Sequence, residues 1–276
     1  MEWIEILKAA ILGILEGITE WLPISSTGHL ILMDEFLRLN ASDAYKEMFF
    51  VVIQLGAILA VVALYWRRLL PISFEGGWSI RRDTLSMWGK IIVACVPAAV
   101  IGLLFDDEMD ALFYNFQTVS VTLIVYGILF IVIEAWRKGR SPQINGIGQI
   151  GYKTAALIGV FQVLSLVPGT SRSGATIIGA MLLGTSRTVA AEFTFYLAIP
   201  VMFGASLLKI VKFGFAFTGL EVIVLLTGLI ISFVVSVLAI KFLMGYIKKH
   251  SFVVFGWYRI ALGAVVLSYF LLTQVI

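Results

Sequence analysis

Long apolar runs recur along this sequence, and they constrain its fold more than any other feature. Six of them cover roughly residues 48–66, 88–105, 118–136, 189–208, 220–240 and 253–273. A bilayer core about 30 Å thick is crossed by about 20 apolar residues of helix. The chain is 60% hydrophobic and only 13% charged, so it lacks the polar surface of a soluble domain. We therefore expect an all-α polytopic membrane protein that forms a single integral membrane domain over residues 1–276.

Two further apolar segments, residues 6–33 and 154–184, are interrupted midway by Pro, Gly, Ser and charged residues. A break at membrane depth is tolerated only where the backbone is buried in protein or lines a cavity. We expect each segment to be a re-entrant helix–loop–helix element.

A weak internal repeat relates these two segments. An offset of 146 residues aligns five pairs: Gly13 with Gly159, Glu16 with Gln162, Ser25 with Ser171, Thr27 with Ser173 and Gly28 with Gly174. Each half, about residues 1–136 and 147–276, then contains one broken element and three spans. Because three is odd, the halves have opposite orientations, which is the inverted-repeat plan of many transporters. We expect the two breaks to meet near the membrane midplane.

Positive charge is unevenly distributed between the two sides of this topology. The segments 67–90, 137–153 and 241–250 hold twelve Lys and Arg residues, whereas the opposite side holds five and the acidic run "DDEMD" at 106–110. The positive-inside rule places the twelve in the cytoplasm and both termini outside. The net charge of +3 is too small to indicate a nucleic-acid partner.

Residues 13–29, "GILEGITEWLPISSTGH", concentrate polarity in an apolar region. Glu16 and Glu20 are four residues apart and share one helix face. Inside a membrane, two carboxylates require a cation, a metal ion or protons. Gly13 and Gly17 form a small-xxx-small pair that allows another helix to approach closely.

The stretch "PISSTGH" at 23–29 contains the break. Pro23 disfavours helical backbone just before it, and Ser25, Ser26 or Thr27 can cap the helix that follows. His29 lies three residues beyond Ser26, so its imidazole can come within hydrogen-bond reach of that hydroxyl. This pairing suits a base that activates a serine or a water nucleophile.

The second break, "VPGTSRSGAT" at 167–176, surrounds one arginine with small residues. Arg172 requires a partner at membrane depth, and we expect a substrate phosphate or a structural pairing with Glu16 or Glu20. Arginine suits bidentate phosphate contact. The residues expected to complete a phosphate cradle with Ser25 and Thr27 are Gly169, Thr170, Ser171, Ser173 and Gly174.

Together these groups suit the cleavage of a phosphoanhydride carried by a lipid, with the carboxylates holding a divalent ion or moving protons. Gln54 and Gln162 are buried amides that we expect to line the cavity. Arg187 and Glu192 are expected to pair with each other. Arg259, in "WYRIALG", has no role assigned from the sequence.

"EGITEWLPISSTGH" and "PGTSRSGAT" resemble the two signatures of the bacterial undecaprenyl-pyrophosphate phosphatase family of the bacitracin-resistance type, and the similarity covers essentially the whole chain. The resemblance implies hydrolysis of undecaprenyl diphosphate to the monophosphate and phosphate, recycling the lipid carrier of peptidoglycan synthesis. It implies a multi-pass protein of the bacterial cytoplasmic membrane with its active site open to the outer face. It also implies dependence on a divalent cation, Mg²⁺ or Ca²⁺, and homodimerisation.

The family's motif residues match Glu16, Glu20, Ser26, His29 and Arg172, with Ser171 beside the arginine. Glu16 and Glu20 are the expected metal ligands. The sequence departs at Phe50, where relatives can carry a glutamate, which weakens any claim that an acid is needed at that position. The rival function is a transporter or lipid flippase, because it shares the inverted-repeat architecture.

Overall fold

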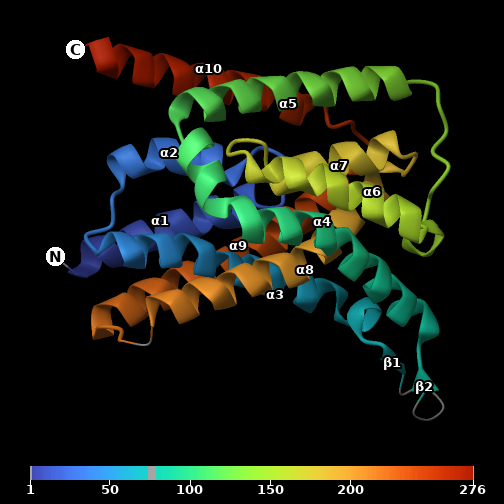
Figure 1. Ribbon diagram of the computed structural model, residues 1–276, viewed down its shortest axis with the longest axis horizontal. Coiled ribbons are helices and arrows are strands. Elements are labelled where there is room, and N and C mark those ends of the chain that lie inside the picture. Colours follow the sequence, from blue (N-terminus) through green and yellow to red (C-terminus); the bar gives the residue numbers. More distant parts are fainter. Residues whose placement is uncertain (1, 74–78, 215, 276) are drawn as a thin grey trace.

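The computed structural model describes residues 2–73, 79–214 and 216–275, without the side chains of residues 34, 35, 106, 107, 110, 274 and 275. The described part is almost entirely helical (Figure 1). Its helices are α1 (Glu2–Thr19), α2 (Ser26–Phe36), α3 (Asp43–Leu69), α4 (Arg82–Phe113), α5 (Phe116–Arg137), α6 (Tyr152–Val163), α7 (Arg172–Leu182), α8 (Arg187–Phe213), α9 (Gly219–Ile247) and α10 (Val253–Val275). Short 3₁₀ turns occupy Ile147–Gln149 and Leu164–Leu166, and strands β1 (Ile72–Ser73) and β2 (Ser79–Ile80) form a small antiparallel hairpin.

Six of the described helices are long and apolar enough to cross a membrane, namely α3, α4, α5, α8, α9 and α10. This confirms the six predicted spans. The helices extend beyond the apolar runs because polar residues cap their ends. Ser42, Ser186 and Thr218, for example, each accept a hydrogen bond from a backbone amide in the first turn of α3, α8 and α9.

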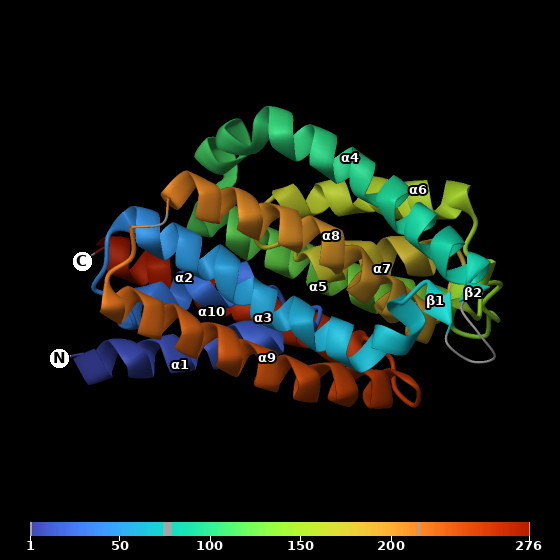
Figure 2. The same cartoon turned by 90° about the horizontal axis from the view of Figure 1, so that it is seen from below.

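Both interrupted segments form two helices joined by a break. In Figure 1, α1 runs inward from the end that carries both termini and α2 returns toward that end. Helices α6 and α7 do the same from the opposite end, as Figure 2 also shows. Their re-entry into the bilayer remains a prediction.

Each broken element packs against a long helix from the other half of the chain. Helix α1 packs along α9 and helix α6 packs along α4. Glycines allow both contacts, because a Cβ on Gly13 would lie 2.6 Å from the Gly228 carbonyl oxygen and one on Gly159 would meet the backbone of Ala94. The small-xxx-small contact predicted for α1 is therefore confirmed. The repeat boundaries themselves stay a prediction.

The cation-rich segments gather at the end opposite the termini. The β1–β2 hairpin and the connection between α5 and α6 lie there, whereas the N- and C-termini share the other end (Figure 1). We call these the basic end and the terminal end. In the acidic run 106–110, the side chains of Asp106, Asp107 and Asp110 lie outside the described residues.

Candidate functional site

The two breaks have the same local structure. Ser25 and Ser171 have φ angles of 73° and 70°, and they are the two non-glycine residues with positive φ in the described chain. Each hydroxyl accepts a hydrogen bond from the amide three residues later, at 3.3 Å from Gly28 and 3.2 Å from Gly174. Left-handed backbone is costly for serine and clusters at functional sites. These caps begin α2 and α7, so the helix amides after each break point into the region between the two breaks.

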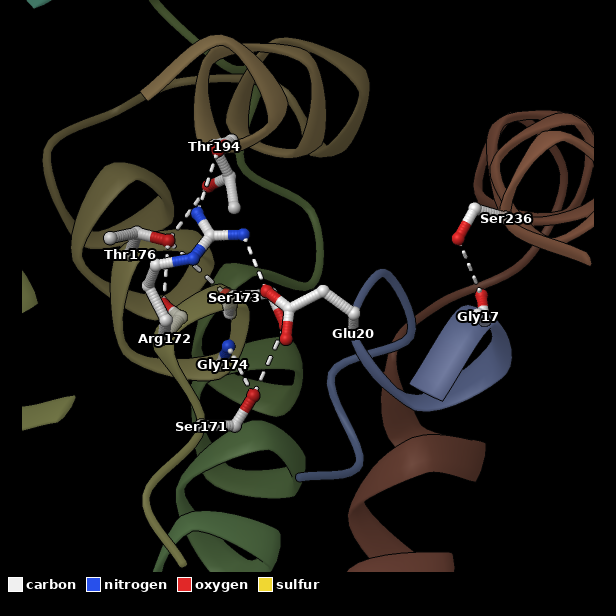
Figure 3. A network of polar contacts seen from close by, with 9 residues as sticks. All are labelled: Gly17, Glu20, Ser171, Arg172, Ser173, Gly174, Thr176, Thr194 and Ser236. Carbon is white, nitrogen blue, oxygen red and sulfur yellow. Dashed lines mark hydrogen bonds and ion pairs between the residues drawn. The ribbon is translucent and has the colours of Figure 1, made fainter. Parts of the chain in front are cut away.

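An ion pair joins the two breaks across 152 positions of sequence. An Nη of Arg172 lies 2.9 Å from a carboxylate oxygen of Glu20, and both side chains are largely buried. The other Nη donates to the Thr194 carbonyl at 3.0 Å, which anchors the guanidinium to α8. Figure 3 shows Glu20 and Arg172 pointing toward each other from the two breaks. Of the two acids expected to balance Arg172, Glu20 is therefore the one in direct contact.

Glu16 and Gln162, which the predicted repeat aligns, are buried without hydrogen-bond partners among the described residues. Glu16 is 0% exposed and Gln162 is 1% exposed. No described residue makes a hydrogen bond with either carboxylate oxygen of Glu16 or with the amide nitrogen or oxygen of Gln162. Buried polar atoms in folded proteins almost always have hydrogen-bond partners. The Nε of Arg172 is also unsatisfied among these residues, so all three groups can bind a polar ligand.

His29 is held by α10 rather than by Ser26. Its Nδ1 lies 2.7 Å from the carbonyl oxygen of Ser25, and its Nε2 lies 2.7 Å from the hydroxyl of Tyr258. Because a carbonyl only accepts, Nδ1 carries the proton and Nε2 is the basic atom. In the described chain no hydrogen bond joins Ser26 to His29, so the predicted pair is not formed in this conformation. Tyr258 was missed from the sequence, although its neighbour Arg259 marked the segment.

Arg259 ties the breaks together through their backbones. It is 0% exposed, and its guanidinium donates to the carbonyls of Pro23 at 3.3 Å, Gly169 at 2.7 Å and Thr170 at 2.9 Å. The guanidinium also lies over the ring of Tyr126, with its carbon 5.6 Å from the ring centroid. Arg259 thus fixes the first break against the second.

The predicted phosphate cradle is only partly assembled by direct contacts. The hydroxyls of Ser171 and Ser173 lie 3.1 Å apart, and Gly169 has a φ of 86°, which favours glycine. Thr27 and Ser26 are half-buried at the start of α2. Gln54 is half-buried within α3, where its predicted cavity-lining role remains untested.

The expected pairing of Arg187 with Glu192 is wrong. Arg187 makes a bidentate contact with Glu134 at 2.7 and 2.5 Å, and Glu192 bonds Arg68 at 2.5 Å. Both residues find partners on other helices because positions 187 and 192 project from different faces of α8. These pairs lie toward the basic end and are not part of the site.

The carboxylates fit a divalent cation only in combination with a substrate. In the described part of the chain, no group of three or more His, Cys, Asp and Glu side chains gathers in a metal-binding arrangement. Magnesium, however, is commonly held by one or two carboxylates together with substrate phosphate oxygens. The unpartnered Glu16 and the neighbouring Glu20 meet that requirement.

Known proteins resemble this chain over nearly its whole length. The family model described as bacitracin resistance protein BacA matches residues 9–265. An "Undecaprenyl-diphosphatase" of Desulfitobacterium hafniense is 66% identical, over 98% of both chains. An "Undecaprenyl-diphosphatase 1" of Clostridium acetobutylicum is 64% identical, over 99% of this chain and 100% of the relative. An "Undecaprenyl-diphosphatase" of Enterococcus faecalis is 60% identical, over 97% and 98% of the two chains.

Proposed function

Since this chain belongs to the family of the bacitracin resistance protein BacA, we propose that it is an undecaprenyl-diphosphatase. It hydrolyses undecaprenyl diphosphate to undecaprenyl phosphate and inorganic phosphate. This reaction returns the lipid carrier to cell-wall synthesis and accounts for the family's role in bacitracin resistance.

The observation that carries this function is the meeting of the two breaks. Arg172 from one break and Glu20 from the other are in contact at 2.9 Å, with the unpartnered carboxylate of Glu16 one helical turn from Glu20. A diphosphate offers oxygens to the guanidinium, and Glu16 and Glu20 would hold a divalent cation that would neutralise its remaining charge. Because Arg172 and Glu20 neutralise each other, the site stays stable before the substrate binds.

In this mechanism the terminal phosphorus is attacked by the Ser26 hydroxyl or by a water molecule. A new P–O bond forms, the bridging P–O bond breaks, and the bridging oxygen leaves with undecaprenyl phosphate. The proton of the nucleophile passes to Nε2 of His29, which must exchange its contact with Tyr258 for one with the nucleophile. If serine attacks, water then hydrolyses the phosphoserine; if water attacks, phosphate is released directly.

Arg172 stabilises the charge that develops on the transferred phosphoryl oxygens, as arginine does in other phosphoryl transfers. Ser171, Ser173 and the amides that begin α7 donate hydrogen bonds to the same oxygens. Glu16 and Glu20 would hold Mg²⁺ or Ca²⁺, which supplies charge neutralisation of the diphosphate when it is bound.

The protein is a multi-pass membrane protein. We place it in the bacterial cytoplasmic membrane with the terminal end outside, which is supported by the gathering of cationic segments at the opposite end. In this orientation the site opens to the outer face. The six helices expose apolar surface to membrane lipids. We also propose that the protein forms a homodimer within the bilayer.

Phosphate release from a prenyl diphosphate by the purified full-length protein tests this function. We expect turnover that requires a divalent cation and is lost in Arg172→Ala. A protein that releases no phosphate with Mg²⁺ or Ca²⁺, but moves lipids across vesicle membranes, would instead be a transporter. Ser26→Ala distinguishes attack by the Ser26 hydroxyl from attack by water. Turnover is abolished if serine attacks and substantially retained if water does.

A further inference from the structure

A cationic cavity lies at the basic end, apart from the two breaks. Its volume is about 280 Å³, and its polar lining consists of Arg137, Arg140, Ser186, Arg187, Thr188 and Lys248. These residues come from the end of α5, the segment after it, the start of α8 and the position after α9. Four of the described lining residues are cations and none is an acid.

Among the described residues, only one of these four cations forms an ion pair. Arg187 makes the bidentate pair with Glu134. Arg137 instead donates to two neutral groups, the carbonyls of Met181 at 2.9 Å and Thr185 at 2.6 Å. These bonds fix the orientation of its guanidinium. Glu134 also attracts Arg137, but its single negative charge is already paired with Arg187.

Arg140 and Lys248 form no ion pair with a described residue. The guanidinium carbon of Arg140 lies 4.1 Å from the ring centroid of Trp136, so an aromatic face rather than a carboxylate orients it. No ion pair to Arg137, Arg140 or Lys248 occurs among the described residues. Four cations therefore line one small cavity, and the single carboxylate of Glu134 serves two of them, so an anion bound there would relieve their mutual repulsion.

The donor set favours a phosphate group over other anions. Two guanidinium groups offer forks that match pairs of phosphate oxygens, and the Lys248 ammonium adds a point charge. Ser186 and Thr188 also line the cavity, and their hydroxyls can donate further hydrogen bonds. Arg137 is already oriented by its carbonyl partners, so less side-chain freedom is lost on binding.

We propose that this cavity is a second phosphate-binding site, independent of the site between the breaks. The phosphate can belong to the headgroup of an anionic phospholipid or to free inorganic phosphate. An adjoining cavity of about 300 Å³ shares Arg137 and Arg140 and is bordered by Trp136 and Leu182, which are 48% and 41% exposed. This apolar border suits acyl chains, and basic sites between transmembrane helices commonly bind lipid headgroups.

Two double variants with equal loss of charge provide the test. Arg140→Gln with Lys248→Gln removes two cavity-lining cations. Lys138→Gln with Lys249→Gln removes two exposed cations that neighbour them in sequence but do not line the cavity. None of these four cations forms an ion pair with another described residue, but Arg140 stacks on Trp136, so the stabilisation of each variant is measured from its own unfolding temperature without ligand. Both are made in an Arg172→Ala background, which weakens phosphate binding between the breaks.

The full-length protein, delipidated in detergent, is titrated with short-chain phosphatidylglycerol, short-chain phosphatidylcholine or inorganic phosphate while the unfolding temperature is measured. We expect the phosphatidylglycerol concentration for half-maximal stabilisation to rise at least tenfold in the cavity variant and to stay unchanged in the control variant. Phosphatidylcholine should not distinguish the variants.

The source of the phosphate follows from the third titration. If inorganic phosphate shows the same tenfold difference, free phosphate occupies the site; if only phosphatidylglycerol does, the ligand is a lipid. The proposal is overturned if the cavity and control variants respond alike to both probes, or if neither probe stabilises the protein. Phosphate release by the protein with Arg172 intact is measured separately, so failure of this site leaves the proposed function standing.

Discussion

The guanidinium of Arg172 contacts Glu20 with one nitrogen and the Thr194 carbonyl with another. A lysine offers the same charge at a single point and cannot make both contacts. We therefore expect Arg172→Lys to lower kcat/KM by about 10²- to 10³-fold, the range seen when one donor to a transition-state oxyanion is removed.

Arg68→Lys is the matched control for this substitution. Arg68 also pairs with an acid on α8, Glu192, but its side chain is 65% exposed at the basic end. Phosphate release should remain near that of the wild type. Equal activity of Arg172→Lys and the wild type would contradict the role given to the guanidinium fork.

The hydrogen bond between Tyr258 and His29 predicts energetic coupling between the two residues. Tyr258→Phe retains the ring that stacks on the imidazole, with centroids 5.6 Å apart, and removes only the hydroxyl. We expect kcat/KM to fall severalfold when Tyr258→Phe is made in the wild type. The same substitution should change kcat/KM little when it is added to the His29→Ala variant. The double-mutant cycle should give a coupling free energy of about 0.5–3 kcal/mol. Additive effects would mean that Tyr258 does not act through His29, and Tyr269→Phe on the same helix is the control.

Arg259 bridges the backbones of the two breaks, so its replacement should disturb stability as well as activity. Lysine cannot reach the Pro23 carbonyl on one side and the Gly169 and Thr170 carbonyls on the other at the same time. Each buried carbonyl left unsatisfied costs about 1–3 kcal/mol. We expect Arg259→Lys to lower the unfolding temperature in detergent and to reduce phosphate release. An unchanged unfolding temperature would show that the bridge is not required for stability.

Much of the fold follows from patterns that a single sequence displays. Hydropathy alone locates α3, α4, α5, α8, α9 and α10, because each contains enough apolar residues to cross the hydrocarbon layer. The breaks are equally visible, since Pro23 and Gly169 interrupt apolar runs that would otherwise be continuous. The Arg172 partner could be narrowed to Glu16 or Glu20, because the two acids share a helix face.

Side-chain partners on distant helices could not be predicted in this way. The three-residue spacing of Ser26 and His29 allows a hydrogen bond, but the packing of α10 brings Tyr258 to the imidazole instead. Arg187 and Glu192 are close in sequence, yet the rotation of α8 directs Arg187 to Glu134 on α5. These choices depend on how helices are rotated about their axes, which local spacing does not specify.

The glycine contact between α1 and α9 predicts a stability difference between two Gly→Ala substitutions. A Cβ at Gly13 would lie 2.6 Å from the carbonyl oxygen of Gly228, so the helices must separate. At Gly204 in α8, no described atom lies within 4 Å of the added Cβ. We expect Gly13→Ala to destabilise the protein by about 1–3 kcal/mol. Gly204→Ala should be neutral or stabilising by up to about 1 kcal/mol, because alanine favours helix. Unfolding in detergent measures both, and equal effects would contradict the close approach of α1 to α9.

The unpartnered carboxylate of Glu16 predicts a specific change in metal dependence. Glu16→Gln keeps the size of the side chain and removes the charge that would hold a divalent cation next to Glu20. We expect the Mg²⁺ or Ca²⁺ concentration for half-maximal phosphate release to rise at least tenfold. Gln162→Glu is the reciprocal variant, since the predicted repeat aligns residue 162 with residue 16 and both are buried. It adds a carboxylate at that counterpart position rather than restoring the one beside Glu20, so it should not rescue Glu16→Gln in the double variant. An unchanged metal requirement in Glu16→Gln would show that this carboxylate is not a metal ligand, because loss of a ligand shifts the metal titration.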